Sequence, residues 1–233
     1  MAILESLRPW RSKRGVRSRR WPFNVALLFA GAAAARLVVP AGAVGAALYA
    51  EGENLGLLRV LDAPLWLRAI LGALVLDFAI WAQHIAFHRI PVLWALHKLH
   101  HTDVDLDATS AGRFHPLEIL LSLGLKAGLA VAFGIPAAAV IVYESLLAVF
   151  AVLTHANIGA NPVAERRLAR VVITPGLHRV HHSIHVDESN SNFGTITSIW
   201  DRIFGTLRPE TREDSRTMTM GVRAADSTLR DGT

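Results

Sequence analysis

Four long apolar runs constrain the fold of this chain more than any other feature. They cover about residues 22–50, 66–88, 117–133 and 136–153, and polar segments separate them. At 1.5 Å per residue, about 20 helical residues cross the ~30 Å hydrocarbon core of a bilayer. Hydrophobic residues make up 52% of the chain and charged residues only 18%, against about 25% in soluble domains. We therefore predict an all-α integral membrane protein with about four transmembrane helices.

The first apolar run leaves two interpretations open. Arg36 and Pro40 interrupt it, so it forms either one kinked helix or a broken pair of helices. Alternatively, Arg36 could face a neighbouring helix and pair with a carboxylate. Residues 51–66 are expected to form a short connection on the non-cytoplasmic side.

A basic segment precedes the first apolar run. Its positive residues are Arg8, Arg11, Lys13, Arg14, Arg17, Arg19 and Arg20. Positive residues beside a membrane helix stay in the cytoplasm and favour anionic lipid, so we expect a membrane partner and no nucleic acid. We assign residues 1–21 to this cytoplasmic segment and residues 22–69 to the first transmembrane region with its connection. Residues 209–233, rich in charged and small polar residues, are predicted to be a disordered tail.

All eleven histidines lie between residues 84 and 185, and most fall in three clusters. The clusters are His84 and His88; His97, His100 and His101; and His178, His181 and His182. Positions i, i+3 and i+4 of a helix share one face, so each cluster can present its imidazoles to one point. Imidazole binds iron, zinc, copper and nickel, and one metal uses about three or four protein ligands. The number of histidines therefore predicts two metal ions, about 3.5–4 Å apart or somewhat further.

The remaining sequence defines the surroundings of this site. The chain has no cysteine, which excludes thiolate ligands, disulfides and cysteine-bound iron–sulfur clusters within it. Four crossings from a cytoplasmic N-terminus place all three clusters on the cytoplasmic face, in a helical cap. We expect the aspartates of residues 102–107 to form a solvated acidic loop and His185 to lie on the surface. Lys126 and Glu144, both in apolar runs, are expected to pair.

Two segments carry a resemblance to a known family. They are DFAIWAQHIAFHRIPVLWALHKLHHTDVDLDATSAGRFHPLE, from Asp77 to Glu118, and TPGLHRVHHSIHVDESNSNFGTITSIWDRIFGT, from Thr174 to Thr206. Together they resemble the fatty acid hydroxylase and sterol desaturase superfamily, and in particular its bacterial sterol desaturase family proteins. The resemblance covers roughly residues 70–208, which would be the catalytic region. Two departures are Ile85, where many members carry Arg, and Trp81, where Tyr is common.

The resemblance implies a set of metal ligands. They would be His84, His88, His97, His100, His101, His155, His178, His181 and His182. His155 could instead be a capping or core histidine at a helix end. His115 matches a further position of the family and would be either a tenth ligand or a residue of the substrate entrance. Residues that could hydrogen bond to the ligand imidazoles are Asp77, Asn157, Asp187 and Asn192; Asp77 could instead be the partner of Arg36 or Lys126.

The resemblance also implies the chemistry and its partners. Two iron ions, with O2 as co-substrate, would remove hydrogen from an unactivated C–H bond of a lipid-like substrate, by hydroxylation or desaturation. Sterols and fatty acyl chains are both compatible, and zinc could replace iron in purified material. Electrons would come from an external ferredoxin or cytochrome with its reductase, because the chain has no Gly-x-Gly-x-x-Gly motif for a nucleotide.

The expected location is the bacterial inner membrane, with the site facing the cytoplasm; the sequence does not fix an oligomeric state. Two other classes also fit a histidine-rich membrane protein. One is a metal transporter, and the other is a zinc-binding structural or hydrolytic protein.

Overall fold

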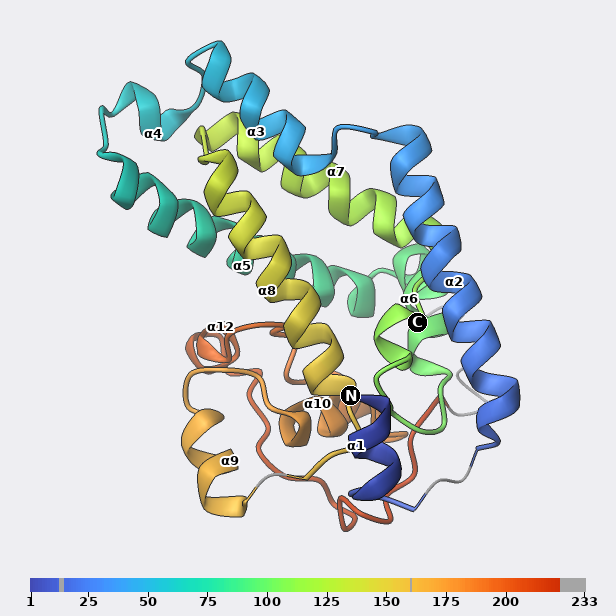
Figure 1. Ribbon diagram of the computed structural model, residues 1–233. Coiled ribbons are helices and arrows are strands. Elements are labelled where there is room, and N and C mark those ends of the chain that lie inside the picture. Colours follow the sequence, from blue (N-terminus) through green and yellow to red (C-terminus); the bar gives the residue numbers. More distant parts are fainter. Residues whose placement is uncertain (13–14, 160, 223–233) are drawn as a thin grey trace.

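A computed structural model describes residues 1–12, 15–159 and 161–222 (Figure 1). The regular secondary structure of the described chain is helical, apart from two isolated antiparallel bridges, Val172–Thr197 and Ser183–Met220. Long helices form one layer, and short helices and loops form a cap at one of its ends. The predicted all-α architecture is confirmed.

Four candidate membrane spans make up the long layer. The first, Arg17–Val60, contains α2 (Arg17–Val38), α3 (Gly42–Gly52) and α4 (Leu57–Val60); the others are α5 (Leu65–Arg89), α7 (Pro116–Phe133) and α8 (Ala137–His155). Their mean hydropathies lie between 1.6 and 2.1. Much of their apolar surface is exposed, as it would be against lipid: Phe29 is 69% and Leu37 83% exposed. The chain is therefore an integral membrane protein with four candidate crossings.

The first apolar run is a broken pair of helices. α2 ends at Val38, two residues before Pro40, and α3 begins at Gly42 with a φ of 62°. Proline removes a backbone donor and disfavours helix in the residue before it, and glycine allows the left-handed turn that follows. Arg36 donates to the carbonyl of Pro40 at 2.6 Å rather than to a carboxylate, so the expected ion pair of Arg36 is wrong.

A tight turn joins α7 to α8. Gly134 takes the left-handed conformation (φ 63°, ψ 44°) just after α7, and Pro136 precedes α8. Lys126 on α7 and Glu144 on α8 form the expected ion pair at 2.6 Å. Ile135 in the turn is fully buried in the main apolar core, which α3, α5 and α8 also line.

The cap gathers the polar segments at the end of the layer where α5 and α8 finish. It contains α1 (Ala2–Leu7), α6 (Pro91–His101), the 3-10 helix η1 (Ser110–Gly112), α9 (Pro162–Leu168), α10 (Pro175–His181), α11 (Val186–Ser189) and α12 (Ile199–Ile203). Three of these helices begin with proline at their first position, where its missing N–H has no partner to lose. Thr174 caps α10 by accepting from the N–H of Leu177.

The acidic loop is buried, which corrects the prediction of a solvated loop. Asp103, Asp105 and Asp107 are at most 4% exposed. The guanidinium of Arg20, also buried, contacts Asp103 at 2.5 Å and Asp107 at 3.0 Å, and donates to the carbonyl of Asp105. Buried charges are stable only when they are paired and hydrogen bonded. The basic segment therefore supplies the counter-charge for this loop, in addition to any contact with lipid; Lys13 and Arg14 lie outside the described residues.

The C-terminal segment also differs from its prediction. Residues 209–222 are packed on the cap, where Met218 and Met220 form a small buried cluster with Leu106. The buried Arg11 donates to the carbonyl of Met218 at 2.5 Å and so ties this segment to the N-terminus. The prediction of disorder rested on the polar composition of the segment, in which these two buried methionines carry little weight. The rest of the predicted tail, residues 223–233, lies outside the described part of the chain.

Candidate metal centre

Nine histidines converge in two groups at the junction of the spans and the cap. The first, here the five-histidine group, contains His84, His88, His97, His101 and His181; the second, the four-histidine group, contains His100, His155, His178 and His182. Within each group, one ligand nitrogen per residue lies within 4.8 Å of all the others. These are the nine histidines that the resemblance assigned, and the structure divides them into two sets.

Helical spacing explains the division. On α6, His97 and His101 are four residues apart and join the five-histidine group, whereas His100 faces the other group. Around α10 the pattern is reversed: His178 and His182 are four residues apart and join the four-histidine group, and His181 joins the other. Each His-x2-His-His box thus gives an i, i+4 pair to one group and a single ligand to the other. The ends of α5 and α8 complete the groups.

In the five-histidine group, outer hydrogen bonds fix which nitrogen faces inward. The Nδ1 atom of His84 lies 2.7 Å from the carbonyl of Phe193, that of His181 lies 2.8 Å from the carbonyl of Ser191, and that of His97 lies 2.6 Å from the carboxylate of Glu118. Each Nδ1 must donate its proton to such an acceptor, so each Nε2 carries a lone pair.

Two of these lone pairs oppose each other directly. The Nε2 atoms of His84 and His97 are 3.1 Å apart, and the Nε2 atoms of His88, His101 and His181 are buried with no hydrogen-bond partner in the described chain. Facing lone pairs repel unless a cation lies among them, and a buried acceptor without a partner is costly. The donor set therefore fits a metal ion, because all the ligands are nitrogens of the kind that iron and zinc accept.

The four-histidine group is more enclosed and has fewer outer partners. Successive Nε2 atoms lie 3.0 Å apart from His100 to His155, 3.0 Å from His155 to His178, and 3.1 Å from His178 to His182. The Nδ1 atom of His155 lies 2.6 Å from the carbonyl of Ala151. The Nδ1 atoms of the other three are buried without a hydrogen-bond partner in the described residues. Four nitrogens at this spacing match the number of ligands that one metal ion uses.

The cap histidines are held in their neutral form. Burial, followed by the nearby imidazoles, lowers the pKa of His100, His101, His178 and His182 well below the usual value. Burial likewise lowers the pKa of His181 to about 3. Neutral imidazole is the form that binds metal, so the site is ready for ions at neutral pH.

His115 lies outside both groups. It is the N-cap of α7, where its Nδ1 accepts from the N–H of Leu117 at 3.2 Å. An acceptor at this position satisfies one of the free N–H groups of the first helical turn. The structure thus gives His115 a capping contact outside the two groups, and its place at the substrate entrance stays a prediction. His185, half-buried, pairs with Glu213 at 2.9 Å.

The four residues expected to support the ligands have other partners. Asp77 accepts from the hydroxyl of Thr197 at 2.6 Å and from the indole of Trp200 at 2.8 Å. It therefore fastens α5 to the cap, and it does not pair with Arg36 or Lys126. The exposed Asp187 forms surface ion pairs with Arg208 and Arg212.

The two asparagines hold backbone segments. Asn157 exchanges hydrogen bonds with the N–H and carbonyl of Arg11, which fixes the N-terminal segment next to the end of α8. Asn192, at φ 52°, donates to the carbonyls of Leu177 and Arg208. It thereby joins α10 to the chain after α12, so it supports the ligands only through the backbone.

Two carboxylates that support the site, Glu118 directly and Asp201 through the backbone, were not singled out from the sequence. Glu118 accepts from His97, and a carboxylate in the first turn of an apolar helix, three residues after His115, was the available signal. Asp201 is fully buried and accepts from the indole of Trp81 and from the N–H groups of Phe193 and Gly194. It therefore positions the Phe193 carbonyl that receives the proton of His84.

A family model for fatty acid hydroxylase matches residues 69–206, more than half of the chain and all nine of these histidines. The chain belongs to the fatty acid hydroxylase family. The family assignment made from the sequence is thus confirmed.

Curated relatives agree with this membership. The chain is 30% identical over 152 residues to the ornithine lipid hydroxylase OlsE of Rhizobium tropici, covering 65% of this chain and 45% of the relative. It is 31% identical over 150 residues to the human alkylglycerol monooxygenase (64% and 32%) and 30% identical over 139 residues to the cholesterol 25-hydroxylase-like protein of Danio rerio (59% and 54%). The match thus spans from about a third to just over a half of the length of these relatives. No solved structure matches the chain.

Proposed function

We propose that this protein is a membrane-bound, non-haem di-iron oxidoreductase that uses O2 to hydroxylate or desaturate a C–H bond of a lipid. The observation that carries the proposal is the division of nine buried histidines into two groups at the ends of apolar helices. Membership of the fatty acid hydroxylase family and relatives named as lipid hydroxylases and monooxygenases support the same reaction class. The nine histidines would be the ligands, one ion to each group.

The protein's own residues would bind, orient and shield the ions. When bound, iron would supply the O2 chemistry needed to attack an unactivated C–H bond, with electrons from an external donor. Glu118 and the carbonyls of Phe193 and Ser191 hold their imidazoles with Nε2 inward, which sets ring orientation before an ion arrives. The cap covers most of the ligand rings: His100, His101, His181 and His182 are at most 2% exposed, so these four rings are shielded from bulk water.

Substrate and electrons would come from opposite sides. A lipid would enter from the bilayer, since the groups lie where α5 and α8 end. An external ferredoxin or cytochrome would deliver electrons from the aqueous side, because the chain has no cysteine for a cluster of its own. With the basic N-terminal segment in the cytoplasm, the cap would face the cytoplasm, in a bacterial inner membrane.

The test removes one ligand and compares it with a histidine outside the groups. His181→Ala should lower bound iron and abolish lipid oxidation in cells, whereas His185→Ala should retain both. Lipid extracts from cells grown under heavy-isotope oxygen are compared by mass spectrometry: uptake of the label indicates hydroxylation, and loss of two hydrogens indicates desaturation. Unchanged turnover in His181→Ala would reject the proposal.

The placement of the groups also separates this proposal from the alternatives. A metal transporter needs ligands near the middle of several spans, but here they lie at the ends of α5 and α8 and in the cap. A zinc protein is distinguished by its metal content after expression in iron-replete cells and by the absence of an oxidised lipid.

A further inference from the structure

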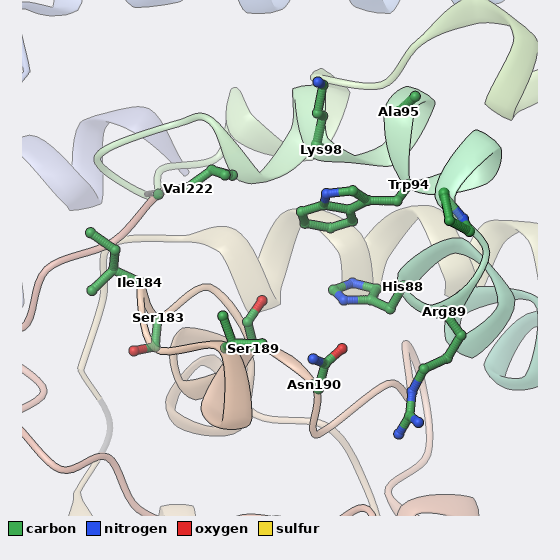
Figure 2. A pocket seen from close by; sticks show the side chains of 13 residues that line it. His88, Arg89, Trp94, Ala95, Lys98, Ser183, Ile184, Ser189, Asn190 and Val222 are labelled. Carbon is green, nitrogen blue, oxygen red and sulfur yellow. The ribbon is translucent and has the colours of Figure 1, made fainter. Parts of the chain in front are cut away.

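A cavity reaches the five-histidine group from the surface of the cap. Its volume is about 120 Å³, which is enough for a small polar group and too little for part of a second protein. Residues at the α5–α6 junction and on α11 line it, with the ring of His88 in its wall. Figure 2 shows the indole of Trp94 lying over His88, with the amide of Asn190 beside that ring. A molecule in this cavity would thus touch a residue of the metal centre.

The charges around the cavity have one sign. Arg89 and Lys98 line it at opposite ends, with Trp94 and His88 between them and with their charged groups turned away from these two rings (Figure 2). No carboxylate is among the lining residues. In the part of the chain that the structure describes, neither cation has an ion-pair partner. Asn190 and the hydroxyl of Ser189 add hydrogen-bonding groups. This combination is complementary to an anion such as a carboxylate or a phosphate.

An apolar surface adjoins the same opening. Ile90 is 45% and Val92 70% exposed, and they flank Pro91, which lines the cavity. Because α5 is a candidate span that ends at Arg89, these side chains would lie at the level where lipid chains meet their headgroups. A lipid could therefore leave its chains beside Ile90 and Val92 and place its headgroup in the cavity.

We propose that this cavity binds the anionic headgroup of the lipid substrate, with Arg89 and Lys98 as its charge partners. This inference rests on the proposed function and extends it, because it names the substrate class. It also places the oxidised carbon close to the polar end of the lipid, since the headgroup lies against His88. A substrate with a neutral headgroup would leave the two cations without a partner.

The test measures lipid binding to the purified full chain with its metal, without requiring turnover. Three probes separate the sources of the anion: dioctanoyl phosphatidic acid, neutral dioctanoylglycerol with the same chains, and inorganic phosphate. The phosphatidic acid should bind at least about tenfold more tightly than either of the others. The double variant Arg89→Gln/Lys98→Gln should lose that preference while it retains its iron. The matched control, Arg166→Gln at an exposed position of α9, should leave the preference unchanged.

Three outcomes would overturn the inference. Equal binding of the two lipids would show that the cavity does not recognise the charge of the headgroup. Tight binding of phosphate alone would show a site for a free anion. Slower reduction by an electron carrier in the double variant, with lipid binding intact, would assign the cations to a protein partner. A preference for the anionic lipid without any lipid oxidation would reject the proposed function and leave the binding site standing.

Discussion

The two histidine groups differ in what holds their rings. In the five-histidine group, a carboxylate and two backbone carbonyls accept the Nδ1 protons of His97, His84 and His181. In the four-histidine group, only His155 has such an acceptor among the described residues, and His100 is instead stacked on Phe114 at 4.3 Å. Hydrogen bonds to a ligand's far nitrogen fix its tautomer and raise its basicity. The five-histidine group is therefore organised before metal binds, whereas the four-histidine group relies on packing.

The largest expected effect comes from replacing either of two neighbouring ligands that belong to different groups. His100→Ala and His101→Ala remove neighbours on α6 that belong to different groups. Each variant should lose one of two bound ions, and each should lose at least about 100-fold in activity, because direct ligands matter more than their outer partners. Metal analysis with iron spectroscopy should show a different ion missing in each variant. Loss of both ions, or of the same one, would mean that the groups do not bind metal separately.

The second prediction concerns the buried ion pairs that Arg20 forms with the loop after α6. Arg20→Ala would leave the buried carboxylates of Asp103 and Asp107 unpaired, at a cost of about 3–5 kcal/mol in the free energy of unfolding. The loop that they occupy follows α6, which serves both groups, so both ions should be held less tightly. Thermal unfolding in detergent measures this, with the exposed Arg19→Ala as control. A variant as stable as the control would remove Arg20 from this role.

The third prediction tests the hydrogen bond between His97 and the carboxylate of Glu118. Glu118→Gln should weaken the ion of the five-histidine group about 10–100-fold, because His97 loses its charged acceptor, and should leave the other ion in place. The control is Glu213→Gln, which alters the same kind of pair at His185, outside both groups. Competition with a chelator measures the two affinities. Equal weakening of both ions would contradict the comparison.

The smallest effect is expected from pH near neutrality. Burial lowers the pKa of His181 from 6.5 to about 3. Below pH 6.5 the unfolded chain therefore binds a proton that the folded, metal-free chain does not, so the free energy of unfolding falls as pH drops from 6.5 towards 3. The loss should be slight between pH 7 and 6 and approach about 1.4 kcal/mol per pH unit for each such histidine below that. Thermal unfolding of the metal-free protein over this range should show a flatter dependence for His181→Ala.

Local patterns in the sequence predicted the spans and the ligand candidates. Apolar runs as long as α5 and α8 directly indicate membrane spans. The spacing of the histidines within each cluster places their imidazoles on one helical face. The break at Pro40 was one of two open interpretations, and the left-handed Gly42 decided it. Features that depend on residues close in sequence were therefore accessible.

Features that depend on distant pairing were not. Arg20 meets Asp103 across 83 residues, and Trp81 meets Asp201 across 120. Without these partners an alternating aspartate segment looks like a solvated loop, and nothing near Asp201 in the sequence marks it as buried. The division of each box between two groups also needs α6 and α10 to face each other, which no spacing within one helix specifies.

The claim that the nine histidines form two separate metal positions is tested most directly by anomalous X-ray scattering at the iron edge, on crystals of the purified full chain. We predict two peaks, one surrounded by His84, His88, His97, His101 and His181 and the other by His100, His155, His178 and His182. A single peak shared by both groups, or iron bound away from them, would contradict the account.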